Sequence, residues 1–311
     1  MQKSGNRRKF LRDITLTVSA LVLGSNLPLQ GCREQPYSKS APFDIMKEIS
    51  KYRKINTHEH GWPYADPANL IKIADKMEIE KLVISTPITN PDRLATPDEF
   101  RECNDLVLKA MKQFPDRFMG QVFINPIYGS ESLREIDRCI GLGMTGLKIY
   151  NQVKINDPLL YPVIEKFIDL KMIILVHSHC GLGVGGHRTK YGNVQPNASI
   201  PEDFAEAASR YPEAMFQYAH LCGPGDWEYA CKMLSPYPNV YADLSGSNNE
   251  ANVVNFALEH FGEDRLFFGT DLWFYQGLGV VLSSEISDIR KKKIFFDNYN
   301  EILRKSGNHV D

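Results

Sequence analysis

Short apolar runs alternate with longer segments of helical periodicity from about residue 52 onward. The run Ile173-Ile174-Leu175-Val176 is apolar without interruption, as expected of a parallel strand that is buried on both faces. In the segment 98–114, apolar residues instead recur every three or four positions, which predicts an amphipathic helix. Strands are predicted at eight places, namely Tyr52–His58, Lys81–Thr86, Phe118–Asn125, Gly146–Tyr150, Met172–His177, Met215–His220, Val240–Leu244 and Leu266–Thr270.

Eight strand–helix repeats within about 255 residues match the size of a (β/α)8 barrel. An open doubly wound sheet is the alternative, but it would need fewer strands and usually has a glycine-rich phosphate loop after the first one. No such loop follows the first predicted strand. We therefore predict an α/β protein in which residues 51–311 form a single TIM barrel.

The N-terminal residues have the layout of an export signal. Arg7-Arg8 precedes an apolar run at 14–24 that is shorter than the roughly 20 residues of a membrane-spanning helix. The arginine pair resembles a twin-arginine signal, and Leu29-Gln30-Gly31-Cys32 resembles a lipobox whose cysteine is acylated. We expect residues 1–32 to be this signal, with a signal anchor or a basic tail as alternatives. Residues 33–50 are polar and aperiodic and are interpreted as a tether.

These assignments predict an exported lipoprotein, anchored to a membrane through Cys32 and facing the periplasm or the cell exterior.

The composition of the chain excludes some classes of protein but does not select a function. The 311 residues are 43% apolar and 24% charged, as in ordinary globular proteins. A formal charge of −2, which becomes −6 without the predicted signal, does not indicate a nucleic-acid partner. Six cysteines are too few for a disulfide framework, although Cys180 and Cys222 both follow strands and could pair.

The candidate chemistry lies at the strand ends, where barrel enzymes carry their catalytic groups. His58 and His60 point to the same face of the first strand, roughly 7 Å apart, because side chains alternate with period two. Two such imidazoles can converge on one cation. A lone strand-end histidine is more often structural, but five of the eight histidines lie at strand ends, at positions 58, 60, 177, 179 and 220, and Asp271 follows the eighth strand.

This order of residues resembles the amidohydrolase superfamily, in particular its amidohydrolase-related branch, which is similar to aminocarboxymuconate-semialdehyde decarboxylase. The resemblance covers about residues 52–304 and rests on five segments: 58–60, 174–177, 218–223, 266–271 and 293–299. It implies that His58, His60, His177 and Asp271 hold a divalent metal, most often zinc, with one ion favoured and two possible. It also implies that Asp271 and His220 are the catalytic acid/base or electrostatic groups.

Three positions leave alternatives open. Asn56 stands where members of the branch usually have aspartate, which changes a partner of the metal ligands. Lys148 occupies the place of the carboxylated lysine that bridges two metals in binuclear members, but it could instead bind substrate or form a structural pair. His179 could replace His177 as ligand or, like Lys148 and His220, contact a second metal or the substrate.

The expected ligand is a small molecule, for which a carboxylate is one option. Arg188 and Lys190, in the glycine-rich segment 180–199, could receive that carboxylate, or the segment could be a flexible lid without contact. Trp62, Tyr150 and Trp273 lie near strand ends and could line the pocket, although packing is the more frequent role of such aromatics. A homodimer is one assembly that fits such a chain.

Three functions are compatible with these residues. The first is a metal-dependent hydrolase in which metal-activated water attacks an amide, ester or lactone carbonyl. The second is non-oxidative decarboxylation of an unsaturated or aromatic carboxylic acid, which the same branch performs. The third is a non-catalytic surface-binding lipoprotein, for which Asn56 is the only hint.

Overall fold

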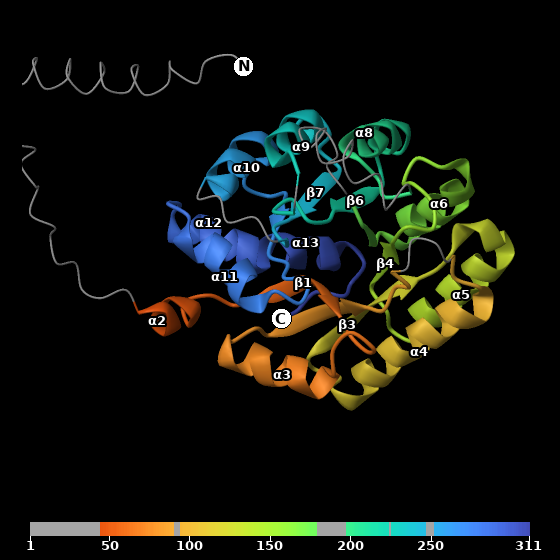
Figure 1. Ribbon diagram of the computed structural model, residues 1–311, viewed down its shortest axis with the longest axis horizontal. Coiled ribbons are helices and arrows are strands. Elements are labelled where there is room, and N and C mark those ends of the chain that lie inside the picture. Colours follow the sequence, from red (N-terminus) through yellow and green to blue (C-terminus); the bar gives the residue numbers. More distant parts are fainter. Residues whose placement is uncertain (1–43, 90–93, 179–196, 224, 247–251) are drawn as a thin grey trace, which may run out of the picture. The chain divides into compact units, whose positions relative to one another are not determined.

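Eight parallel strands form a ring in the computed structural model, which describes residues 44–89, 94–178, 197–223, 225–246 and 252–311 (Figure 1). Each strand pairs with the next one along the chain, from β1 to β8. This topology confirms the predicted (β/α)8 barrel. The strands are β1 (Ile55–His60), β2 (Lys81–Ser85), β3 (Phe118–Phe123), β4 (Gly146–Ile149), β5 (Ile173–Val176), β6 (Met215–Tyr218), β7 (Val240–Asp243) and β8 (Leu266–Phe267).

Main-chain hydrogen bonds between β1 and the residues after β8 close the ring. Thr57 N donates to Phe268 O at 2.9 Å, and Asp271 N donates to His58 O at 2.8 Å. We expected the eighth strand to continue to Thr270, but β8 ends at Phe267. The chain then turns through left-handed conformations at Asp271 (φ 47°) and Leu272 (φ 70°). We call this junction between β1 and residues 268–272 the seam. It places Asp271 beside His58.

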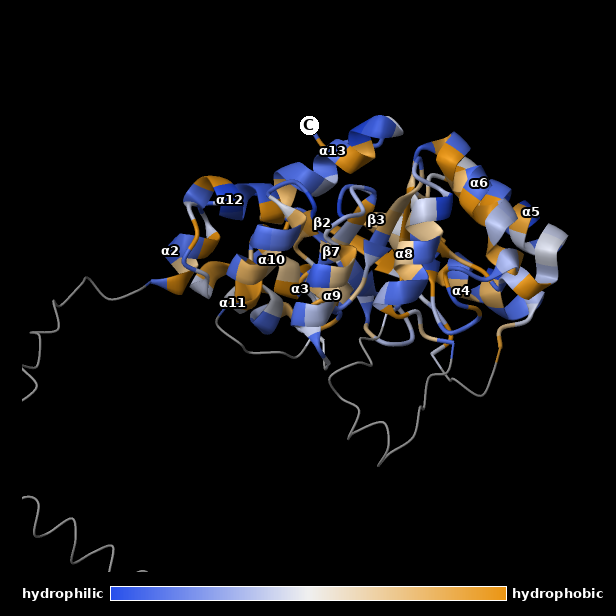
Figure 2. Cartoon of the chain, turned by 90° about the horizontal axis from the view of Figure 1, so that it is seen from above, coloured by the Kyte–Doolittle hydropathy of each residue, from blue (hydrophilic) through white to orange (hydrophobic). Residues whose placement is uncertain are grey.

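Helices surround the strands, with hydrophobic sides turned toward the barrel and hydrophilic sides toward solvent (Figure 2). In the longest of the described helices, α4, Phe100, Val107 and Ala110 are buried. That helix begins at Pro97, where Thr96 N donates to Glu99 Oε2 at 2.9 Å. The helices are α2 (Ile45–Ile49), α3 (Pro67–Lys76), α4 (Pro97–Gln113), α5 (Gly129–Gly141), α6 (Tyr161–Leu170), α8 (Pro201–Arg210), α9 (Trp227–Leu234), α10 (Val253–Phe261), α11 (Phe274–Ser283), α12 (Asp288–Lys292) and α13 (Asn298–Lys305), with short 3-10 turns η1 (Pro126–Tyr128) and η2 (Pro158–Leu160) and the π-helix η3 (Lys293–Asp297).

An apolar cluster fills the N-terminal end of the barrel. Ile55 and Val83 from the strands pack there with Phe296 and Tyr299, which come from η3 and α13. All four side chains are at least 95% buried. The polar strand-end residues therefore lie at the opposite end of the barrel, as in other barrels of this type.

The folded unit begins earlier than the sequence indicated. Helix α2 lies within the residues that we expected to form a tether, and Asp44 caps it by accepting from Met46 N at 3.1 Å and Lys47 N at 3.2 Å. Ile49 is buried, so residues 44–50 belong to the barrel domain. A helix of five residues is too short to produce a recognisable periodicity. The predicted signal, with Cys32, and the rest of the tether lie outside the described residues.

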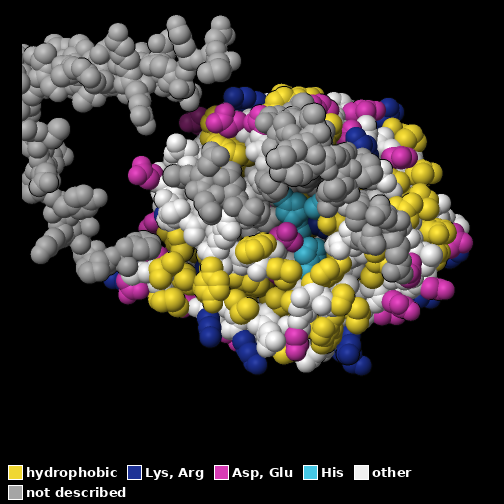
Figure 3. Space-filling view, in the orientation of Figure 1, with side chains coloured by type: hydrophobic (Ala, Val, Ile, Leu, Met, Phe, Trp, Pro, Cys, Tyr) yellow, Lys and Arg dark blue, Asp and Glu magenta, His cyan; other side chains and the backbone are white. Residues whose placement is uncertain are grey.

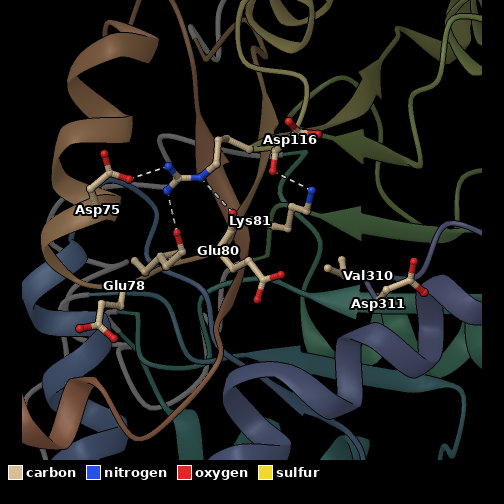
Figure 4. Close-up of a pocket in the computed structure, with 9 residues that line it drawn as sticks. Asp75, Glu78, Glu80, Lys81, Asp116, Val310 and Asp311 are labelled. Atoms are coloured by element: carbon tan, nitrogen blue, oxygen red, sulfur yellow. Dashed lines mark hydrogen bonds and ion pairs between the residues drawn. The ribbon is translucent and has the colours of Figure 1, made fainter.

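A cavity of about 590 Å³ lies at the N-terminal ends of β2 and β3, far along the strands from the predicted site (Figure 4). Its cations already have partners, since Arg117 pairs with Asp75 at 2.5 Å and Lys81 Nζ donates to Asp116 O at 2.7 Å. Among the described helices, none combines the length and apolar character needed to cross a membrane.

Candidate active site

Strand β1 delivers two histidine rings to the barrel interior. His58 is fully buried and His60 is 7% exposed, and their ring centroids are 5.4 Å apart. Each Nδ1 has an acceptor: Asp243 Oδ2 at 3.1 Å from His58, and Ser85 O at 3.2 Å from His60. With Nδ1 donating in both rings, Nε2 is the atom of each ring that can bind a metal when it carries no proton.

Asp271 faces both of these nitrogen atoms. Its Oδ1 lies 2.9 Å from His60 Nε2 and 3.8 Å from His58 Nε2, and its side chain is 26% exposed. Burial alone would raise the pKa of Asp271. The surrounding histidines lower this pKa by more than burial raises it, so the net pKa is below the ordinary range. Figure 3 shows histidine side chains next to an acidic one in a hollow near the middle of this face.

This trio fits a divalent metal. Among the described residues, His58, His60 and Asp271 offer ligand atoms that all lie within 4.8 Å of one another. Imidazole nitrogen and carboxylate oxygen are ligands that zinc and manganese accept. The predicted convergence of these three residues is therefore observed.

Asp243, at the end of β7, links His58 to His220 through hydrogen bonds. The sequence analysis did not identify it as a site residue. It is fully buried. Its Oδ2 accepts from His58 Nδ1 and from Gln217 Nε2 at 2.9 Å, while Oδ1 accepts from His220 N at 3.2 Å and from Ser245 N at 3.1 Å. Burial raises its pKa, but His58, His220 and the hydrogen bonds lower it more, so Asp243 remains ionised. The available signal was a single carboxylate in an otherwise apolar strand.

His177 and His220 form a hydrogen-bonded pair. Which of the two rings donates is determined by Asp243, through Ser245. A carboxylate can only accept, so Ser245 Oγ donates to Asp243 Oδ1 at 2.5 Å. Ser245 Oγ then accepts from His220 Nδ1 at 3.1 Å, and His220 Nε2 accepts from His177 Nδ1 at 3.0 Å. Burial lowers the pKa of His220 to about 3, so its ring is neutral and has one proton. With this direction, Nδ1 is the donor atom of the His177 ring.

The geometry agrees only in part with the roles predicted for His177, as a metal ligand, and for His220, as a catalytic group. The trio assembles without His177, which instead contacts His220. His220 lies 3.6 Å from Asp271 Oδ2 through its Nδ1, beside the trio. His220 also adopts a left-handed backbone conformation, with φ 62°, and such conformations are frequent at functional sites.

Lys148, on β4, is fully buried and donates to His58 Nε2 at 2.8 Å. Burial lowers the pKa of Lys148 to about 8. A metal bound to His58 would take the lone pair that this hydrogen bond uses. Lys148 therefore lies beside one of the candidate metal ligands.

Asn56 contacts the candidate ligand His58 through the main chain and not through the ring. Its side chain bonds the main-chain N–H of His58 and the Thr270 side chain, at 3.3 Å and 2.6 Å. The partner of the His58 ring is Asp243 instead. Glu59, also missed, accepts from four donors around the same seam.

The aromatic candidates divide between packing and exposure. Tyr150 stacks on His177 with ring centroids 4.1 Å apart. Trp62 packs against the core with Lys109 Nζ 4.7 Å from its ring centroid. Trp273, two residues after Asp271, is 59% exposed.

Further candidates lie outside the described residues: His179, Arg188 and Lys190, together with Cys180. Cys222, which we considered as a disulfide partner of Cys180, is a free and fully buried thiol.

Solved structures of similar fold are mostly decarboxylases. A dihydroxybenzoic acid decarboxylase from Polaromonas sp. JS666, with bound manganese and the inhibitor 2-nitroresorcinol, has a TM-score of 0.63 and 18% identity over 81% of this chain and 97% of that one. A 2,6-dihydroxybenzoate decarboxylase from Rhizobium has a TM-score of 0.64 and 15% identity over 82% and 100%. A 5-carboxyvanillate decarboxylase from Sphingomonas paucimobilis has a TM-score of 0.63 and 16% identity over 81% and 99%.

At sequence identities of 15–18%, these structures show a similar fold and do not identify the reaction. A comparison with curated protein sequences gives no match. The family comparison is more specific, because the model described as amidohydrolase matches residues 27–288. That match covers most of the chain, including His58, His60 and Asp271, and this chain therefore belongs to the amidohydrolase family.

Proposed function

We propose that this protein is a metal-dependent hydrolase that cleaves an amide, ester or lactone of a small molecule. The observation that carries the proposal is the position of the Asp271 carboxylate. One oxygen faces His58 and His60, the other faces His220, and the side chain remains partly exposed. A carboxylate in this place can exchange protons with both a metal-held reactant and a leaving group.

His58, His60 and Asp271 would hold the metal, and His177, the ligand after β5 that the family resemblance implies, would be the fourth ligand. We propose one divalent ion, zinc or manganese. When bound, it polarises a carbonyl oxygen and lowers the pKa of water. A second ion bridged by a carboxylated Lys148 remains the alternative, and a metal content of one ion per chain in fully active protein would exclude it.

The residues of the chain have separate tasks in this proposal. Asp271 takes a proton from the attacking water and returns it to the leaving nitrogen or oxygen. His220, whose only proton goes to Ser245, keeps the His177 ring in place and borders the space next to Asp271. The aromatic side chains of Tyr150 and Trp273 would contact the substrate, and Arg188 or Lys190 would receive a carboxylate.

Decarboxylation of an aromatic or unsaturated acid is the second candidate, because the similar solved structures reported above are decarboxylases. Product analysis distinguishes the two. A panel of small esters, amides, lactones and aromatic acids is incubated with the metal-loaded protein in H₂¹⁸O. Hydrolysis predicts one ¹⁸O in the acid product. Carbon dioxide release without ¹⁸O in the remaining product would favour decarboxylation, and no turnover of either kind, in protein that binds the metal, would favour a binding protein.

We also propose that residues 1–32 direct export and that Cys32 carries a lipid, as Arg7-Arg8 and the segment 29–32 suggest. Cell fractionation tests this. The native chain is expected in the membrane fraction, and Cys32→Ser is expected to release it. A native chain found only in the cytosol would contradict the proposal.

A further inference from the structure

Glu59 lies between the two metal-ligand candidates of β1 but faces away from them. It is fully buried. Its Oε1 accepts from His60 N and from Leu272 N, both at 2.9 Å. Its Oε2 accepts from Thr270 Oγ1 at 2.5 Å and from Asn56 Nδ2 at 3.1 Å. One carboxylate therefore joins β1 to the turn that follows β8.

The partners of Glu59 on that turn are the residues directly before and after Asp271. Thr270 is held through its hydroxyl group and Leu272 through its main-chain N–H. Asp271 and Leu272 both have positive φ although neither is glycine. Such conformations persist only where the surroundings determine them strongly.

Asn56 completes the arrangement. Its Nδ2 donates to Thr270 Oγ1 at 2.6 Å, which directs the single hydroxyl proton of Thr270 toward Glu59. Its Oδ1 accepts from Thr270 N at 3.1 Å. The turn is thus fixed from both sides of Asp271 by two side chains of β1.

We infer that Glu59 is a positioning residue, which holds Asp271 at the distance from His60 that metal binding requires. This inference rests on the proposed function only in taking Asp271 as a metal ligand. Both oxygens of Glu59 must accept, because all four facing groups are donors. An amide in its place would turn an NH₂ group toward two of those donors.

The test compares Glu59→Gln with Glu135→Gln. Glu135 is a matched control, because it is also a buried carboxylate with several donors, among them Asn104 Nδ2 at 2.9 Å and Arg138 Nε at 2.8 Å. It lies on α5 and bonds to α4, away from the metal-ligand candidates. Two properties are measured on full-length metal-free protein: Mn²⁺ affinity by calorimetry, and amide hydrogen exchange of the peptide that contains residues 270–273.

We expect Glu59→Gln to weaken Mn²⁺ binding at least about tenfold and to accelerate exchange at residues 270–273. Glu135→Gln is expected to change neither property, even if it lowers the unfolding midpoint. Unchanged exchange at residues 270–273 in Glu59→Gln would overturn the inference. So would equal losses of Mn²⁺ affinity in both variants.

A second pair of variants applies if Glu59→Gln does not fold. Thr270→Val removes the hydroxyl group that Glu59 holds, and Thr270→Ser keeps it. Weakened Mn²⁺ binding and faster exchange in Thr270→Val, with recovery in Thr270→Ser, support the inference. Equal behaviour of the two variants contradicts it. If the native chain binds neither Mn²⁺ nor Zn²⁺, the proposed function fails, and the exchange measurement alone decides whether Glu59 holds the turn.

Discussion

Replacing Asp243 by asparagine should weaken metal binding through a change in the His58 ring. Two main-chain N–H groups, from His220 and Ser245, approach Oδ1 and cannot change direction. The oxygen of the new amide must therefore stay at that position. Its NH₂ group then faces His58 Nδ1 and Gln217 Nε2, both of which are donors in the native protein.

The magnitude follows from these two contacts. A buried donor without an acceptor costs about 1–3 kcal/mol. His58 can relieve its contact by moving its proton from Nδ1 to Nε2 only if Lys148, which donates to that Nε2 at 2.8 Å in the native protein, turns away or loses a proton. The Gln217 contact remains in either case, so the unfolding free energy should fall by at least about 1–3 kcal/mol. The moved proton occupies the lone pair that a metal needs. Loss of such a partner typically weakens metal binding by about 10–100-fold.

Urea unfolding and calorimetric titration with Mn²⁺ measure the two effects in Asp243→Asn. Glu135→Gln is again the control, because it disturbs a buried carboxylate without contact to a ligand histidine. The control should lose stability but keep the native Mn²⁺ affinity. If Asp243→Asn binds Mn²⁺ as tightly as the native protein, Asp243 does not determine the proton position of His58.

Four further outcomes are expected. Lys54→Met should lower the unfolding free energy by about 2–4 kcal/mol, because the buried ammonium group donates to three main-chain carbonyl oxygens; Lys51→Met, at an exposed ion pair, should cost under about 1 kcal/mol, and equal losses would contradict this. Dialysis against a chelator should abolish turnover, and Zn²⁺ or Mn²⁺ should restore it, whereas persistent turnover would refute a metal requirement. Asp271→Asn should fold but lower kcat at least about 10²-fold, and a native kcat would remove its role as proton carrier. The thiols of Cys222 and Cys231 are fully buried, so native-state labelling should be no faster than unfolding, and rapid labelling would show local opening.

The barrel was predictable because short runs rich in apolar residues alternate with segments of helical periodicity. Ile173–Val176 is apolar at every position and forms β5 with those bounds. The end of β8 was not predictable in the same way, since the turn at Asp271 depends on hydrogen bonds with Asn56 and Glu59 from a distant part of the chain. Helix α2 was missed because its five residues are too few to show helical periodicity, and an aspartate such as its N-cap Asp44 is not diagnostic by itself.

Residues that converge at strand ends were predictable, while their partners were not. His58, His60 and Asp271 come together because alternation in β1 and the end of β8 place them at one end of the barrel. Asp243, Ser245 and Glu59 could not be assigned from sequence, because a buried carboxylate is recognised by the donors around it, and those donors come from other strands. The same reason explains why the contact between Asn56 and Thr270 was not predicted.

A crystal structure of the protein soaked with Mn²⁺, with anomalous diffraction recorded, would show whether His58, His60 and Asp271 bind a metal. We expect one strong anomalous peak bound by the rings of His58 and His60 and by the carboxylate of Asp271, with Lys148 displaced from His58. An anomalous peak elsewhere, such as in the cavity between Asp75 and Asp311, or no peak at these three residues at saturating Mn²⁺, would contradict it.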